Sequence, residues 1–150
     1  MTTVSTRLAG LADLAAIAPL FDAYRQFYEQ DANLAVAEAF VRDRMERGES
    51  SIIVAEAGDG EALGFCQLYP SFCSVIAAPI VVLYDLFVTP VSRQSGTGRA
   101  LMLAAERYAQ QRGFARMDLT TAKTNVLAQS LYTSLGWQRD EVFYAYNKSC

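Results

Sequence analysis

A short polar run with two closely spaced glycines is the stretch of this sequence best suited to hold an anion. Residues 93–100, RQSGTGRA, follow the apolar run LYDLFV and precede the helix-like run LMLAAERY. The first turn of a helix has N–H groups without an intrahelical acceptor, and the helix dipole places roughly half a positive charge there. Because Gly96 and Gly98 lack a Cβ, the backbone there can approach a phosphate closely. The pattern predicts a diphosphate site, and the alternative is an ordinary strand-to-helix turn.

Two common nucleotide motifs do not fit this loop. No Lys-Ser or Lys-Thr pair follows Gly98, which disfavours a P-loop. GTGRAL begins like the dinucleotide fingerprint GxGxxG but ends in leucine, and TTAKTN, after the next predicted strand, lacks the acidic residue that a ribose would need.

The sequence contains no histidine, which restricts the acid–base chemistry that it can perform. Ser-His-Asp and Cys-His catalysis are excluded, so proton transfer must use carboxylates, tyrosines, lysines or water. The three cysteines, Cys66, Cys73 and Cys150, show no CxxC spacing. That pattern favours a reduced cytoplasmic protein over a disulfide scaffold, and we expect no metal site.

Composition indicates a folded protein of about one domain, which we expect to span residues 1–150. Hydrophobic residues make up 52% of the chain and charged residues 19%, a balance that disordered chains do not have. The net charge of −3 disfavours nucleic acid as a partner. No apolar run approaches the ~20 residues of a membrane span, and the N-terminus lacks the apolar centre of a signal peptide, so we expect no membrane association.

Hydrophobic spacing predicts a mixed α/β fold in the order β-α-α-β-β-β-α-β-α-β. Strands are expected at residues 3–7, 51–57, 61–69, 79–88, 115–120 and 142–147, and helices after Asp13, after Asn33, at 96–111 and at 125–135. Asp13 and Asn33 are the predicted N-caps of the first two helices. The sheet should be mixed, with helices on its faces.

Two stretches together resemble the GNAT superfamily, the Gcn5-related N-acetyltransferases. LFVTPVSRQSGTGRALM is similar to the acetyl-CoA motif of that family, [RQ]-x-x-G-x-[GA], at Arg93, Gly96 and Gly98. TTAKTNVLAQSLYTSLGW resembles the closing motif of the family at Asn125, Ala128, Tyr132 and Gly136. Within the superfamily, the chain looks most like small bacterial members and, more distantly, diamine and polyamine acetyltransferases. The resemblance implies a GNAT fold with a splayed central sheet.

The resemblance also implies how acetyl-CoA would bind as the acyl donor. The diphosphate would lie on the loop formed by Arg93, Gln94, Ser95, Gly96, Thr97, Gly98 and Arg99. The pantetheine arm would pair like a strand with the backbone of Leu86, Phe87 and Val88, beside a bulge. Asn125 would contact the cofactor; it could also be the N-cap of the last helix, and the two roles are compatible. Tyr132 would contact it too and act as general acid, since a phenol pKa of ~10 is close to that of the leaving thiolate.

The general base stays open at this level. Polyamine-type members carry a glutamate where this chain has Tyr84, and Asp85 follows one residue later. Strand alternation is expected to send Tyr84 and Asp85 to opposite faces, so that Asp85 would not simply replace the glutamate. Asp85 could otherwise be a structural carboxylate, with ordered water and another carboxylate doing the work. The acceptor pocket is expected near Tyr24, Tyr28, Glu29 and Asp31, together with Tyr84.

The function implied is acetyl transfer from acetyl-CoA to a primary amine, with a small molecule favoured as the acceptor. One alternative is acetylation of a protein N-terminus or lysine, and another is a non-catalytic sensor of acyl-CoA. The oligomeric state is left open, with a homodimer as one option.

Overall fold

The computed structural model describes residues 3–150 and divides into two compact units. The first unit ends at Leu119, and the second is Thr120–Cys150. The first contains a complete sheet with helices on both faces, and the second contains one helix and the C-terminal segment. The single domain expected from chain length stays a prediction.

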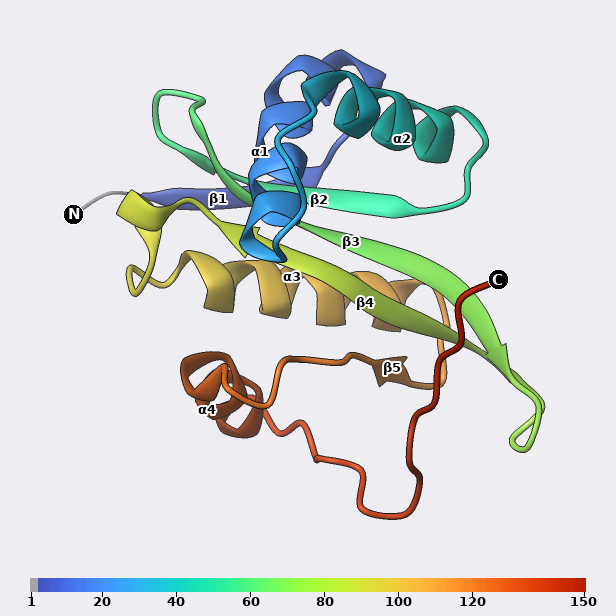
Figure 1. Ribbon diagram of the computed structural model, residues 1–150. Coiled ribbons are helices and arrows are strands. Elements are labelled where there is room, and N and C mark those ends of the chain that lie inside the picture. The colour runs from blue at the N-terminus through green and yellow to red at the C-terminus, as the bar shows by residue number, and fades with distance from the viewer. Residues whose placement is uncertain (1–2) are drawn as a thin grey trace. The chain divides into compact units, whose positions relative to one another are not determined.

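A five-stranded sheet forms the centre of the first unit (Figure 1). The strands follow one another in chain order, and all neighbouring pairs are antiparallel except the last, which is parallel. They are β1 (Val4–Leu8), β2 (Ser51–Ala57), β3 (Ala62–Cys73), β4 (Ala78–Val88) and β5 (Met117–Asp118). The predicted mixed α/β class is therefore confirmed.

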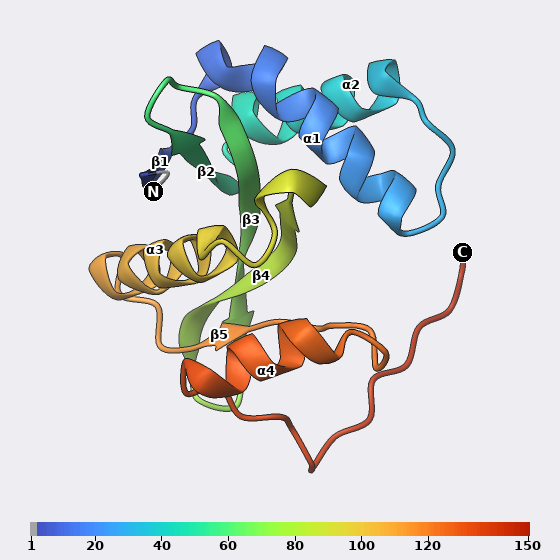
Figure 2. The ribbon, with the colours of Figure 1, turned by 90° about the vertical axis from the view of Figure 1, so that its left-hand side faces the viewer.

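Three helices cover this sheet because each has one apolar face. Helices α1 (Leu14–Phe27) and α2 (Leu34–Glu46) lie on one face, and α3 (Thr97–Gln111) lies on the other (Figures 1 and 2). The core on the α1 side joins Ile17 and Phe21 of α1 to Val41 of α2 and to Phe65 and Phe87 of the sheet. Two 3-10 turns, Leu11–Asp13 and Pro90–Ser92, complete the unit.

Of the two predicted helix caps, one is confirmed and one is wrong. The Asn33 side chain accepts the Val36 N–H at 3.1 Å and caps α2. Asp13 makes no cap hydrogen bond to α1. Its carboxylate instead accepts the Gly10 N–H at 2.8 Å and pairs with Arg7 at 2.8 Å, because the preceding 3-10 turn and β1 bring these donors within reach.

Strand β4 carries a bulge in the middle of its pairing with β3. Gln67 pairs with Asp85 and Leu68 with Leu83, so Tyr84 has no partner across the strands. On its other edge β4 pairs with β5 only at Val81 and Val82. No strand among residues 3–150 pairs with that edge from residue 83 to residue 88, as expected for a splayed central sheet.

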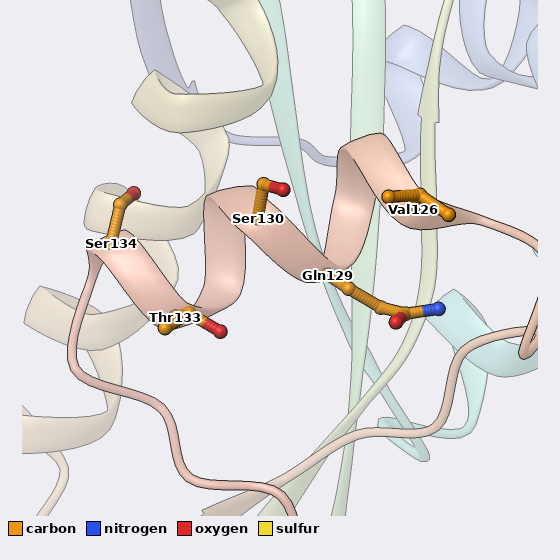
Figure 3. Close-up of a pocket in the computed structure, with 5 residues that line it drawn as sticks. All are labelled: Val126, Gln129, Ser130, Thr133 and Ser134. Carbon is orange, nitrogen blue, oxygen red and sulfur yellow. The ribbon is translucent and has the colours of Figure 1, made fainter.

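The second unit contains α4 (Val126–Ser134), and its N-cap is Asn125, which accepts the Ala128 N–H at 3.3 Å. An open hollow of about 450 Å³ lies along one side of α4 (Figure 3). None of the sequence-predicted site residues lines it; the lining consists of Val126, Gln129, Ser130, Thr133 and Ser134.

The strand predicted at residues 142–147 is not formed. The side chains of Val142, Phe143, Tyr144 and Tyr146 in this segment are 79% to 93% exposed. A strand needs a neighbouring strand for its backbone hydrogen bonds. Apolar and aromatic composition alone could not supply that neighbour, so the predicted final β element is wrong.

Candidate active site

The glycine loop reverses the chain between β4 and α3 through two left-handed residues. Gln94 has φ 60° and Gly96 has φ 89°, and Gly96 is the N-cap of α3. The first intrahelical bond runs from the Ala100 N–H to the Gly96 carbonyl at 2.9 Å. The N–H groups of the preceding helical residues therefore have no intrahelical acceptor, as in any first turn. Left-handed residues among successive amides are typical of concave anion-binding loops.

Polar side chains within the loop support its shape. The Ser95 hydroxyl donates to the Ser92 carbonyl and lies 3.1 Å from the Thr97 hydroxyl oxygen. Thr97 is 0% exposed, so its side chain lies against the protein and supports the loop from inside. Gln94 in a left-handed conformation is strained, and the sequence alone did not indicate this.

Arg93 connects the loop to the end of β4. Its Nε donates to the Val88 carbonyl at 3.0 Å, and its guanidinium lies 5.5 Å from the centre of the Phe87 ring and 5.7 Å from that of Phe27. The structure thus brings the family-motif arginine to the strand end that was predicted to hold the pantetheine arm. The unpaired edge of β4 at residues 86–88 offers backbone groups in the manner of a sheet that accepts one more strand.

Asp85 is a buried carboxylate on the α1 side of β4. It is 4% exposed, and the Gln67 amide donates to its Oδ2 at 2.6 Å. Burial raises the pKa of Asp85 above that of an ordinary aspartate. Hydrogen bonds from Gln67 and, after it, Tyr24 lower this pKa and offset part of the rise. A carboxylate with a raised pKa can take up a proton from a neighbouring amine more readily than a solvated one.

The prediction that Tyr84 and Asp85 lie on opposite faces is wrong, and the bulge is the reason. The Tyr84 ring packs edge-on against Tyr69 at 5.5 Å, and the Tyr24 hydroxyl donates to the Tyr84 carbonyl at 3.4 Å. The pKa values of both Tyr24 and Tyr69 are raised, first by burial and then by the Asp85 charge. Because the extra residue interrupts the alternation, Tyr84 and Asp85 lie near the same two tyrosines.

Tyr69 is a site residue that the sequence interpretation missed. It lies two residues after Gln67 on β3, so the two side chains share a face of the sheet. Strand alternation along β3 could have indicated it, but only once Asp85 and its partner strand were known.

The residues expected at the end of α1 are only partly gathered around Asp85. Tyr28 packs edge-on against Tyr24 at 5.2 Å and is partly exposed. Glu29 and Asp31 lie after the end of α1 and are exposed. Glu29 is left-handed, with φ 66°, and its N–H donates to the Gln26 carbonyl at 2.9 Å, which ends the helix.

Asn125 and Tyr132 belong to the second unit. Asn125 is the N-cap of α4, a role that is compatible with its predicted contact to the cofactor. Tyr132 lies on α4, with its ring 6.3 Å from that of Trp137, and its carbonyl accepts the Trp137 N–H at 3.0 Å. Their roles toward acetyl-CoA stay predictions.

The splayed sheet, the bulged central strand and the glycine loop at a helix N-terminus are together the framework of an N-acetyltransferase. The chain belongs to the acetyltransferase (GNAT) family, whose family model matches residues 15–137. It is 46% identical, over 95% of both chains, to a protein of Bacillus subtilis described as the uncharacterized N-acetyltransferase YhfO. It is 29% identical to the aminoglycoside N(6')-acetyltransferase type 1 of Salmonella typhimurium, over 82% of this chain and 83% of that protein.

Solved structures show the same fold. A crystal structure of a probable acetyltransferase is 33% identical and covers 97% of both chains, with a TM-score of 0.91. The aminoglycoside N-acetyltransferase AAC(6')-Iy in complex with CoA is 22% identical and has a TM-score of 0.83, covering 100% of this chain and 97% of that one. The second likeness shows the fold alone.

Two further findings concern residues 3–150. None of their helices combines the length and the apolar character needed to cross a membrane. Their Cys, Asp and Glu side chains form no group of three or more that could hold a metal ion.

Proposed function

We propose that this protein transfers the acetyl group of acetyl-CoA to the primary amine of a small cationic molecule. The observation that carries the proposal is the buried Asp85 carboxylate beside Tyr24, Tyr69 and Tyr84. A buried negative charge beside aromatic rings attracts an ammonium group, through both the charge and the ring faces. The named activity of the aminoglycoside acetyltransferase relatives supports a polyamine-like acceptor.

In this proposal the first unit holds the acyl donor. The amides of residues 94–99 bind the diphosphate, and the backbone of residues 86–88 pairs with the pantetheine amides along the unpaired edge of β4. An N–H at this edge also stabilises the oxyanion that forms on the thioester carbonyl. Arg93 holds the loop against the end of β4 through the Val88 carbonyl.

The reaction then needs three proton transfers. The ammonium form of the acceptor gives a proton to Asp85, and the neutral nitrogen attacks the thioester carbon. The C–N bond forms, the C–S bond breaks, and the leaving thiolate takes a proton from Tyr132. The nitrogen of the new amide gives its second proton through water to the Tyr132 phenolate, and Asp85 releases its proton to solvent. Asp85 and Tyr132 are therefore the proposed base and acid, while Tyr24, Tyr28, Tyr84 and Glu29 form the proposed acceptor pocket.

A turnover screen with acetyl-CoA tests the function. CoA release is measured with diamines, polyamines, aminoglycosides, amino acids and short peptides that carry a free N-terminus or a lysine. We expect release to depend on a small amine with more than one positive charge, and mass spectrometry should find one added acetyl group. Activity on peptides alone would indicate protein acetylation instead. Tight CoA binding with only slow hydrolysis, whatever amine is added, would indicate an acyl-CoA sensor.

A further inference from the structure

The side-chain amide of Gln67 on β3 is fully buried and links Asp85 to Ser50 in a short hydrogen-bond chain. It is 0% exposed, and its Nε2 donates to Asp85 Oδ2 at 2.6 Å. Its Oε1 accepts the hydroxyl of Ser50, just before β2, at 2.8 Å. Both ends of the amide are thus satisfied, as a buried polar group requires.

The chemistry of the three groups fixes the direction of this chain. An ionised carboxylate can only accept hydrogen bonds, so Gln67 must turn its NH2 group toward Asp85. Its carbonyl oxygen then points to Ser50, whose hydroxyl can donate. A flipped Gln67 amide would place two acceptors against each other at Asp85. Ser50 therefore helps to hold the only amide orientation that suits an ionised Asp85.

The other groups that face Asp85 are neutral in their usual forms or lie beyond the first contacts. Tyr24 approaches from α1 and Tyr69 from β3, and Tyr84 lies on β4 itself, while Cys66, next to Gln67 in the chain, is near enough for the Asp85 charge to act on it. Burial raises the pKa of the Cys66 thiol to about 12, so that it stays protonated. The nearest charged groups on the α2 side, Arg44 and Glu49, face Tyr69.

We propose that Gln67, oriented by Ser50, is the positioning residue of the catalytic carboxylate: it holds Oδ2 of Asp85 in place while the carboxylate accepts the proton of the acceptor amine. This rests on the proposed function, in which Asp85 is the base. Two effects follow from the geometry. The carboxylate is fixed in one rotamer, and its ionised form gains a short hydrogen bond in addition to the one from Tyr24.

The direct test measures the titration of Asp85 and needs no substrate. The side-chain carboxyl carbon of Asp85 is followed by NMR against pH and is assigned by its loss in Asp85→Asn. Gln67→Leu removes the hydrogen-bond donor and keeps a side chain of similar size. In this variant we expect the titration midpoint of Asp85 to rise by roughly one to two pH units. Ser50→Ala should raise it by less, because the Gln67 amide stays but loses its anchor.

Ser51→Ala is the matched control. The Ser51 hydroxyl lies 2.6 Å from that of Tyr108, so this change also removes one partly buried hydroxyl contact next to Ser50, but outside the Asp85 chain. The Asp85 midpoint should not move in it. An unchanged midpoint in Ser50→Ala and Gln67→Leu would overturn the proposal, and Ser50→Ala decides alone if Gln67→Leu does not fold.

Kinetics provide the second measurement. If the acidic limb of kcat/KM follows Asp85, Gln67→Leu should lose about 10- to 100-fold below the limb and recover most of the activity above it, since one pKa unit is a tenfold change. A loss of equal size at every pH, with an unmoved limb, would make Gln67 merely structural and overturn the inference. Absence of acetyl transfer by the wild-type protein would overturn the proposed function instead, and the NMR midpoint would still test Gln67.

Discussion

The carbonyl oxygen of Phe87 lies 2.5 Å from the point where a Cβ on Gly64 would stand. Gly64 of β3 pairs with Val88 of β4, and the Val88 Cα would be only 3.1 Å from the same Cβ. Both neighbours are backbone atoms of a paired strand, so they cannot rotate away. Glycine at this position therefore lets β3 hold the end of β4 at the place where the pantetheine arm is proposed to pair.

Gly64→Ala is expected to displace the end of β4 and weaken CoA binding. Overpacking of this kind lowers the free energy of unfolding by about 1–3 kcal/mol. Denaturant unfolding and titration calorimetry with CoA measure the two effects. Gly58→Ala is the control, because a Cβ there meets nothing within 4 Å. Equal CoA affinity in Gly64→Ala and wild type would argue against a cofactor role for residues 86–88.

Gly96→Val should weaken CoA binding by placing a side chain at the proposed diphosphate site. Gly96 has φ 89°, so part of any effect will come from backbone strain. Gly113→Val separates the two causes, since Gly113 has φ 75° just after the other end of α3 and a Cβ there also meets nothing within 4 Å. Both variants should lose stability, and only Gly96→Val should lose CoA affinity by calorimetry. Gly98→Val should also weaken CoA affinity, but without this backbone strain, because Gly98 lies within α3 and is not among the glycines with positive φ.

Tyr132→Phe is expected to keep CoA affinity and lower kcat by roughly one to three orders of magnitude, about what a lost general acid costs. The change removes only the hydroxyl and leaves the ring beside Trp137. Tyr144→Phe, at a tyrosine that is 90% exposed, should leave kcat unchanged. Full activity in Tyr132→Phe would mean that water or the amine itself protonates the thiolate.

The rate should rise with pH well into the alkaline range. A base must be ionised to accept a proton, and burial raises the pKa of Asp85, so the active form accumulates only above that raised value. The acceptor amine has a pKa of ~10, so its deprotonation also makes the rate rise with pH. A series of amines separates the two causes, because the midpoint of the limb in kcat/KM moves with the amine pKa only if the substrate sets it.

Asp85→Asn completes this test. If Asp85 sets the limb, the midpoint stays fixed across the amines and the limb disappears in the variant. A fixed midpoint that survives the substitution would exclude both Asp85 and the amine, and would direct attention to Glu29 and Asp31.

Acid should weaken the first unit through Asp13. The Arg7 guanidinium, followed by the Gly10 N–H, lowers the pKa of Asp13 from 3.8 to about 2. The folded state therefore binds this proton less readily than the unfolded state, so the stabilisation is complete above pH 3.8 and lost as the pH falls through about 2. Asp13→Asn should lower Tm at neutral pH, and its difference from wild type should shrink on acidification. Glu46→Gln, at the exposed end of α2, should show no such difference.

Much of the site was predictable from local pattern. The glycine loop was predicted because the strand, the loop and the helix that form it are consecutive in the chain. Asp85 was singled out by the family resemblance, because it follows directly after the position where polyamine-type members carry a glutamate. Gln67 and Tyr69 could not be found in this way, since their proximity to Asp85 depends on which residues of β3 and β4 pair. Whether residues 142–147 form a strand likewise depends on a neighbouring strand that can pair with them, and the local pattern does not show such a neighbour.

The sequence by itself determined the mixed α/β class, the position of the glycine loop and the exclusion of histidine chemistry, because residue type and spacing along the chain suffice for these. Only the tertiary structure decided the environment of the carboxylate. One extra residue at Tyr84 shifts the β3–β4 register, so that Tyr84 and Asp85 lie near the same tyrosines and Gln67 meets Asp85. The resemblance implied a bulge near this strand end, but which residue is the extra one, and therefore which side chains meet across the two strands, had to be seen in three dimensions.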